Sequence, residues 1–267
     1  MKPKIDISYP SEDSVLLAWP EVICPIQHQH IVACQSALVK TLTKHAETCV
    51  VDSVVSYNTL MIYYAFDKIT WPDLTRIIHD EVALLSSSIQ SAVSDSPQTG
   101  SCPDATKTIE IPVYYGLDAG WDLPAVANQT KLTIDEVIAL HSQKTYRAYA
   151  LGFTPGFCYL GCIDEKIQLP RRQSPRVSVP KGAIAIAEQQ TAVYPISSPG
   201  GWHIIGQTPL PMYITDVCAD GHSSFTPAIA VGQKVRFKAI DYNEFCRLGG
   251  QLITEHHLEK NKEIADE

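Results

Sequence analysis

The sequence predicts an α+β domain at the N-terminus, followed by a mainly-β domain that closes into a barrel. Alternating strand and helix patterns occupy the first part of the chain, a stretch rich in Ser, Pro and Asp follows, and short apolar runs separated by turn residues come after it. We therefore expect an N-terminal domain over residues 1–90, a linker over 91–108, a barrel over 109–240 and a C-terminal tail over 241–267.

The chain is long enough for two hydrophobic cores. It has 267 residues, of which 45% are hydrophobic and 19% are charged. A chain of this length buries roughly 70 to 75% of the surface that it exposes when unfolded. The N-terminal sequence MKPKIDISYP lacks the apolar core of a signal peptide, and no uncharged apolar run reaches the length of a membrane span. We expect a cytoplasmic protein with no membrane partner.

Charge and cysteine content argue against three further classes. A net charge of −8 argues against a nucleic-acid partner, because nucleic-acid-binding proteins gather excess Lys and Arg on one face. The eight cysteines are too scattered for a secreted disulfide scaffold. Cys158 and Cys162 are separated by three residues, and no second pair completes a zinc tetrahedron. We expect no metal site.

The N-terminal domain is predicted to contain two strands, a helix, two more strands and a closing helix. The strand-like runs are IDISYP, SVLLAW, CVVDSVV and TLMIYYAF. Apolar residues recur with helical spacing over about Ile26–His45 and Trp71–Leu85. This order fits an antiparallel sheet covered on one face by helices. The stretch with the composition of a linker, SSSIQSAVSDSPQTGSCPDATK, begins directly after the second predicted helix.

The second domain is predicted to hold one clear helix and many short strands. Residues 133–136, with the sequence TIDE, form a capping box, and the apolar face of the helix ends at His141. From Tyr146 to Phe237, short apolar runs favour a closed barrel, which hides the edges of its strands. The Pro155-Gly156 pair suits a type II turn. The run YNEFCRLGGQLI predicts a helix at the start of the tail.

The window from Lys166 to Ala187 is the most informative part of the chain for function. It contains five cations and no acid, namely Lys166, Arg171, Arg172, Arg176 and Lys181. In an acidic chain this inversion of charge favours a bound anion, and Arg offers a planar fork for a carboxylate or phosphate. A solvated loop face is the alternative. Prolines 170, 175 and 180 keep the segment extended, so Arg172 and Arg176 share a side and Arg171 points away.

A glycine pair follows this window. The sequence Pro199-Gly200-Gly201 predicts a tight turn whose free backbone N–H groups face an oxyanion, with Trp202 as a wall of that pocket. The alternative is a hairpin turn with no ligand.

Four polar side chains near these segments are candidates for further roles. His141 is either a neutral histidine in the core or a catalytic base. Gln190, Thr191 and Tyr194 offer hydrogen bonds to an amide, and alternation along a strand places Gln190 and Thr191 on opposite sides.

These motifs resemble the Kip-type family, which includes the B subunit of 5-oxoprolinase and allophanate hydrolase subunit 1. The resemblance lies in GFTPGFCYLG and in LPRRQSPRVSVPKGAIAIAEQQTAVYPISSPGGWHIIGQTPLPMY, and it extends to IEIPVYYG and ALHS and, more weakly, to SYPSEDSVLLAW and VSYNTLMIYY. It covers nearly the whole chain up to about residue 240. It implies an α+β N-terminal domain followed by a mainly-β cyclophilin-like barrel.

The resemblance also implies a function within a complex. Similar chains join the C and A subunits of 5-oxoprolinase to open the ring amide of 5-oxoproline at the expense of ATP, giving glutamate. Others form part of the carboxyltransferase region of urea carboxylase. This chain has no standard nucleotide motif, so ATP is expected to act through the complex and the chain alone to be inactive. The alternative is a regulatory module that inhibits a sensor histidine kinase. A prolyl isomerase is a third, weaker hypothesis, because a similar barrel does not transfer a site.

The resemblance assigns the site residues. His141 and Gln190 are expected to be catalytic, and the expected substrate-binding residues are Arg171, Arg172, Arg176, Thr191, Tyr194, Gly200, Gly201 and Trp202. The substrate 5-oxoproline offers a carboxylate for Arg, an amide for Gln or backbone donors and a ring for an aromatic wall. The chain departs from its relatives at Ala187, Glu188 and Ala192, where glycine is usual. We expect one of two effects. The added side chains narrow a pocket that is lined by backbone, or Glu188 neutralises part of the basic cluster.

Overall fold

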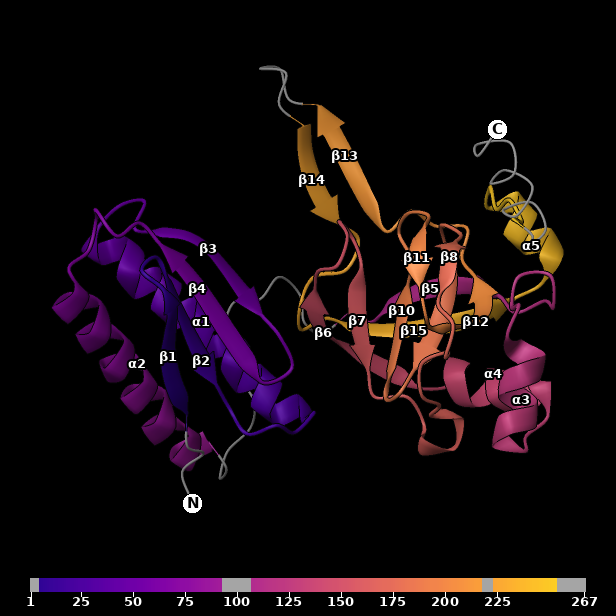
Figure 1. Ribbon diagram of the computed structural model, residues 1–267, viewed down its shortest axis with the longest axis horizontal. Coiled ribbons are helices and arrows are strands. Elements are labelled where there is room, and N and C mark those ends of the chain that lie inside the picture. Colours follow the sequence, from indigo (N-terminus) through magenta and orange to yellow (C-terminus); the bar gives the residue numbers. More distant parts are fainter. Residues whose placement is uncertain (1–4, 93–106, 218–222, 254–267) are drawn as a thin grey trace. The chain divides into compact units, whose positions relative to one another are not determined.

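The computed structural model describes residues 5–92, 107–217 and 223–253 (Figure 1). The chain divides into two compact units, one within residues 1–104 and the other within residues 105–267. Most of the predicted linker, residues 93–106, and the end of the predicted tail, residues 254–267, lie outside the described residues. The domain boundaries drawn from composition stay a prediction.

The first unit contains a four-stranded antiparallel sheet and two helices. The sheet order is β1-β2-β4-β3. The elements follow along the chain as strand, strand, helix, strand, strand, helix: β1 (Asp6–Ser11), β2 (Ser14–Ala18), α1 (Pro25–His45), β3 (Val50–Val55), β4 (Thr59–Tyr64) and α2 (Trp71–Ala92). Helix α1 contacts α2 and the sheet. Alternate strand residues such as Leu60 and Ile62 are buried, as is Leu38 of α1, because side chains two apart on a strand share a face.

Helix α2 is longer than the sequence predicted. It was expected to end at Leu85, but it continues to Ala92. The Ser-rich segment after Leu85 contains no Pro or Gly before Pro97. Serine is only a moderately poor helix former, so composition alone placed the end of this helix too early.

The second unit is built on a closed barrel of seven strands, in the order β10-β7-β6-β15-β5-β12-β9. All neighbouring strands are antiparallel except β5 and β15, which are parallel. The strands are β5 (Ile109–Tyr114), β6 (Thr145–Leu151), β7 (Cys158–Gly161), β9 (Ala183–Ala187), β10 (Gln190–Val193), β12 (His203–Gln207) and β15 (Lys234–Ile240). The closed barrel predicted from the turn-rich sequence is confirmed.

Alternation along the barrel strands separates two hydrophobic clusters. On β9, Ile184 and Ile186 belong to the large core that also contains side chains of helices α3 (Leu123–Thr130) and α4 (Ile134–Ser142). The alanines that alternate with them, such as Ala185, belong to a second cluster with Tyr194 and Trp202. Strand β9 therefore presents one face to each cluster.

Two smaller two-stranded sheets are separate from the barrel. One pairs β8 (Arg176–Val179) with β11 (Ser198–Gly200), and the other pairs β13 (Tyr213–Val217) with β14 (Ser223–Pro227). The remaining short elements are the 3-10 helix η1 (Glu165–Ile167) and the helix α5 (Tyr242–Arg247), which begins the tail as predicted. No helix of the described residues is long and apolar enough to cross a membrane.

One of the two predicted turns is correct and the other is wrong. The Phe157 N–H donates to the Thr154 carbonyl at 3.0 Å and Gly156 has φ of +80°, as a type II turn requires. The Pro199-Gly200-Gly201 segment is instead extended, because Ser198–Gly200 pairs with β8. Gly200 is needed for packing, because a Cβ at this position would collide with the Tyr194 hydroxyl.

The capping box at the start of α4 is confirmed, and it gives a test of local stability. Thr133 Oγ1 accepts from the Glu136 N–H at 3.2 Å, and the Glu136 carboxylate accepts from the Thr133 N–H at 2.7 Å. We expect Thr133→Ala to lower the free energy of unfolding by about 1 kcal/mol, because one helix N–H loses its acceptor. Chemical denaturation measures this change. Thr133→Ser keeps the hydroxyl and should retain most of the stability; equal losses in both variants would contradict the capping role.

Candidate functional site

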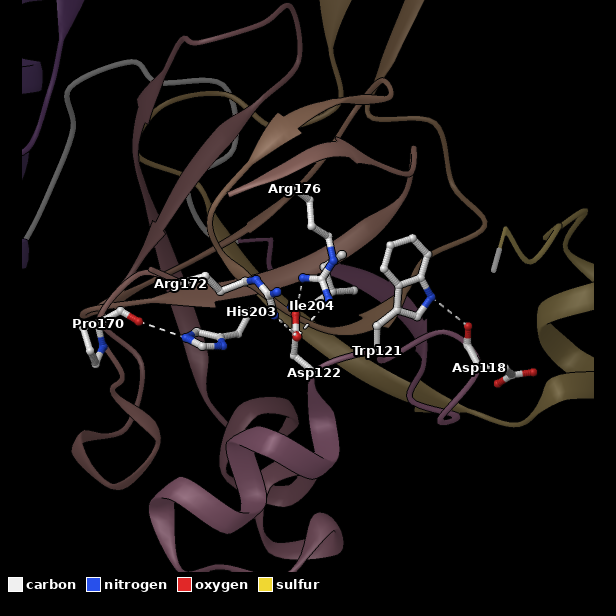
Figure 2. Close-up of polar contacts among 8 residues, drawn as sticks. All are labelled: Asp118, Trp121, Asp122, Pro170, Arg172, Arg176, His203 and Ile204. Atoms are coloured by element: carbon white, nitrogen blue, oxygen red, sulfur yellow. Dashed lines mark hydrogen bonds and ion pairs between the residues drawn. The ribbon is translucent and has the colours of Figure 1, made fainter. Parts of the chain in front are cut away.

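Two arginines of the basic window converge on one buried carboxylate, that of Asp122 (Figure 2). Asp122 Oδ1 accepts from Arg172 Nη1 at 2.5 Å and from Arg176 Nη2 at 3.0 Å. Asp122 Oδ2 accepts from Arg176 Nη1 and from the Ile204 N–H, both at 2.7 Å. Asp122 is only 3% exposed, so four donors replace water around its charge.

Asp122 is a site residue that no sequence pattern indicated. It lies 50 residues from Arg172, directly before α3, where an Asp normally caps the helix. Its side chain makes no capping bond, because it faces the arginines, and its N–H donates to the Ile204 carbonyl at 2.8 Å. The capping position was the available signal, but only the fold shows which cations this carboxylate meets.

Arg171 faces away from this cluster, as the alternation of an extended chain predicted. Its Nε lies 3.6 Å from Glu188 Oε1, and both side chains are more than half exposed. Glu188 has φ of +54° at the tip of the β9–β10 hairpin, a conformation that favours glycine. Glu188 thus neutralises part of the basic window, one of the two effects expected of this departure from the family pattern. An exposed pair of this kind contributes about 0 to 1 kcal/mol.

The segment of residues 170–179, here called the strap, runs beside residues 198–204. The Arg172 N–H donates to the Gly201 carbonyl at 2.8 Å, and His203 Nε2 donates to the Pro170 carbonyl at 2.9 Å. Arg176, opposite Gly200 in the β8–β11 pair, lies 5.3 Å from the centroid of the Trp121 ring. Backbone hydrogen bonds to residues 198–204 and the ion pairs with Asp122 therefore both hold the strap in place.

An aromatic cluster lies in the same region as the strap. The ring of Phe157 is 5.3 Å from that of Tyr194 and 6.0 Å from that of Trp202, and Tyr159 also contacts Trp202. Burial raises the pKa of Tyr194 to about 12, so its hydroxyl stays neutral at physiological pH. The structure thus brings six predicted residues into one neighbourhood: Arg172, Arg176, Tyr194, Gly200, Gly201 and Trp202.

His141 and Thr191 lie together, in the core. The Tyr115 hydroxyl is 2.7 Å from His141 Nδ1, and His141 Nε2 is 2.9 Å from Thr191 Oγ1. Thr191 Oγ1 donates to the Ala185 carbonyl at 3.1 Å, so His141 Nε2 must carry the proton and Nδ1 must accept from Tyr115. The ring also stacks on Phe237 at 4.6 Å. This geometry matches the core interpretation of His141, which is fully buried.

Gln190 lies at the tip of the β9–β10 hairpin, two residues from Glu188, which faces Arg171. It is half-buried at the start of β10, opposite Ala187 and Gly161. A shallow cavity of about 710 Å³ lies beside its neighbour Gln189, and the residues that line it are Lys144, Cys162, Ile163, Asp164, Glu165, Lys166, Gln168 and Gln189. None of the predicted site residues lines this cavity, so we place the candidate site at the Asp122 cluster. Among the described residues, no group of three or more His, Cys, Asp or Glu is placed to hold a metal ion.

Comparisons with known proteins agree with this arrangement of motifs. Residues 5–219 match the family model described as carboxyltransferase domain, subdomain C and D. The chain belongs to this family. It is 50% identical over 107 residues to the B subunit of 5-oxoprolinase from Bacillus subtilis (strain 168), and 38% identical over 141 residues to that of Escherichia coli O157:H7. The resemblance to the Kip-type family is confirmed.

The matched segments cover only part of these relatives. They span 40% and 53% of this chain, and 45% and 65% of the two relatives. The solved structure of TTHA0988 is 30% identical with a TM-score of 0.65, over 85% of this chain and 39% of that chain. The urea carboxylase of Kluyveromyces lactis is 13% identical with a TM-score of 0.64, over 92% of this chain and 22% of that chain, and it shows the fold alone.

The ion pairs of Asp122 predict a large effect of a small change. Asp122→Asn keeps the shape of the side chain but leaves two arginines facing each other without a counter-charge. We expect the free energy of unfolding to fall by about 3 kcal/mol, the lower end of the range for a broken buried pair. Urea denaturation followed by tryptophan fluorescence measures this loss.

The control for this variant is Glu110→Gln, which removes a carboxylate from an exposed pair with Arg236. Its cost should be much smaller than that of Asp122→Asn, because both side chains of this pair are about half exposed and solvent screens their charges. Similar losses in the two variants would show that Asp122 does not hold the strap.

The buried imidazole predicts a dependence of stability on pH. Burial lowers the pKa of His141 from its usual value of 6.5 to about 3. Below pH 6.5 the unfolded chain therefore binds a proton that the folded chain does not bind until about pH 3. The contribution of His141 to the free energy of unfolding is complete above pH 6.5, and it should fall by about 1.4 kcal/mol per pH unit between these values. His141→Gln should remove this slope in denaturation measured at several pH values; a slope unchanged in that variant would contradict the assignment. The exposed His45 provides the control variant, His45→Gln.

Proposed function

We propose that this chain is a subunit of a 5-oxoprolinase complex, a hydrolase that opens the ring amide of 5-oxoproline to glutamate. The observation that supports this most is the convergence of Arg172 and Arg176 beside aromatic side chains, in segments whose motifs match the family. Curated relatives that match part of this chain are named as the B subunit of 5-oxoprolinase. Their matched portions suggest the same assignment here.

The chemistry of the substrate fits the side chains of the site. Hydrolysis breaks the ring C–N bond and adds water, so that one carboxylate and one ammonium group form. The substrate already bears one carboxylate, which an arginine fork binds with two parallel hydrogen bonds. Asp122 neutralises one of the two charges of Arg172 and Arg176, so the cluster keeps a single positive charge, equal and opposite to that of the substrate. The aromatic cluster offers an apolar wall for the ring carbons.

The proposed complex has further components. Its C and A subunits are the proposed partners of this chain, and ATP is proposed to bind through them, so that the chain alone is inactive. We propose that the complex acts in the cytoplasm. Within this chain, the barrel is proposed to be of the cyclophilin-like type and residues 1–90 to form an α+β domain.

His141 and Gln190 occupy different positions relative to the proposed site. Both ring nitrogens of His141 are used within the core, so we give this residue a positioning role through Thr191. Gln190 lies at the tip of the β9–β10 hairpin, opposite Ala187, and we assign it no contact with the substrate.

Reconstitution tests the proposal. Mixing this chain with the C and A subunits, 5-oxoproline and ATP should give glutamate, measured by an enzyme-coupled assay, whereas the chain alone should give none. Folded proteins that form no glutamate in the full mixture would overturn the proposal. A pulldown that recovers a sensor histidine kinase, without the C subunit, would favour the regulatory alternative.

A further inference from the structure

Buried polar atoms without hydrogen-bond partners collect along the strap. Within the part of the chain that the structure describes, Arg172 Nε, Ser198 Oγ and His203 Nδ1 are buried and have no partner. Arg172 belongs to the strap, and the other two belong to the segment that runs beside it. Buried donors and acceptors are normally paired, so an unpaired one calls for an explanation, such as a catalytic role or a bound water or ion. The strap region therefore has unused hydrogen-bonding capacity.

Arg172 has one edge of its guanidinium group available. Asp122 accepts from Nη1, whereas Nε is buried and has no hydrogen-bond partner among the described residues. The Nε–Nη2 edge presents two parallel N–H groups, which match the two oxygens of a carboxylate. Arg176 differs, because both of its terminal nitrogens donate to Asp122 and its side chain is only 10% exposed. A ligand carboxylate is therefore expected to bind Arg172, with Asp122 holding the guanidinium in place.

His203 supplies a complementary acceptor. It is only 6% exposed, and its Nε2 donates to the Pro170 carbonyl, which can only accept. A neutral imidazole with its proton on Nε2 leaves Nδ1 as a hydrogen-bond acceptor. The hydrogen bonds from Arg172 N to Gly201 O and from His203 Nε2 to Pro170 O place the two residues on adjacent segments, and Figure 2 shows both on the same side of Asp122.

We propose that Arg172 and His203 form a subsite for an acid whose N–H group lies next to its carboxylate. Arg172 donates through Nε and Nη2 to the carboxylate, and His203 Nδ1 accepts from the ligand N–H. In 5-oxoproline the ring nitrogen and the carboxylate are bonded to the same carbon, so one small ligand satisfies both residues. The identity of this ligand rests on the proposed function.

Access to the subsite requires movement of the strap. Arg172 Nε and His203 Nδ1 are covered in the free chain, although the Arg172 side chain as a whole is 30% exposed. The strap is not a barrel strand, and its β8 segment pairs only with β11 among the described strands. Lifting the strap at Arg172 would break the hydrogen bond from the Arg172 N–H to the Gly201 carbonyl but none between strands of the barrel. Bound ligand should therefore slow hydrogen exchange of the Arg172 amide.

Calorimetry on the isolated chain tests the subsite, first by comparing two ring acids. The ligands are 5-oxoproline and 5-oxotetrahydrofuran-2-carboxylate, which has a ring oxygen in place of the N–H. The wild-type chain should bind 5-oxoproline about tenfold more tightly, because the ring oxygen cannot donate to His203 Nδ1. His203→Gln keeps a donor for Pro170 and removes Nδ1, so it should abolish this preference.

The carboxylate contact is tested in the same way. Arg172→Lys keeps the charge but loses the planar fork, and it should weaken binding of both ligands about tenfold. Arg247→Gln, at an exposed arginine of α5 paired with Glu244, should change neither. The amide 2-pyrrolidone, which lacks the carboxylate, should show no binding that depends on Arg172.

The outcomes separate this subsite from the proposed function. Lack of 5-oxoproline binding to the folded wild-type chain, or a lactam preference that survives His203→Gln, would overturn the subsite even if the complex forms glutamate. A preference that depends on His203, together with a complex that forms no glutamate, would support the subsite and overturn the proposed function.

Discussion

The carboxylate of Asp122 joins three segments that are far apart in the sequence. It lies at the start of α3, it accepts from two arginines of the strap, and it accepts from the N–H of Ile204 on β12. Removing a carboxylate and two arginines from water is expensive, and only well-placed donors offset the cost. Each oxygen of Asp122 has two such donors, so the strap has one favoured position on the barrel. The contact of Arg176 with Trp121 and the location of the candidate subsite both depend on that position.

Small residues provide the room for this arrangement. Strand β9 presents Ala183, Ala185 and Ala187 to the aromatic cluster, while the isoleucines between them pack in the larger core. Because Gly200 has no side chain, the Tyr194 hydroxyl can approach the two-stranded β8–β11 sheet closely. Larger side chains at the alanine positions would overfill the aromatic cluster, and one at Gly200 would collide with Tyr194. The alternation of alanine and isoleucine on β9 therefore serves the core and the site together.

Local sequence rules predicted what local forces control. The capping box at Thr133, the turn at Gly156 and the opposite directions of Arg171 and Arg172 each depend on neighbouring residues, and the structure agrees with all three. The closed barrel followed from the spacing of short apolar runs. Asp122 and His203 were missed because their partners come from distant segments, which no pattern along the chain brings together. The turn expected at Gly200 was wrong for a related reason, because a strand partner from residues 176–179 extends that segment.

The first and last strands of the barrel, β5 and β15, are neighbours in parallel register. Closure therefore joins Ile109–Tyr114 to Lys234–Ile240, more than a hundred residues later in the chain. Contacts between such distant residues slow folding, because the intervening loop must be ordered before the contacts form. During synthesis on the ribosome, β5 emerges long before its partner and has to wait for it. The first unit, whose sheet lies within residues 6–64, has no such delay and can fold while the barrel is still being made.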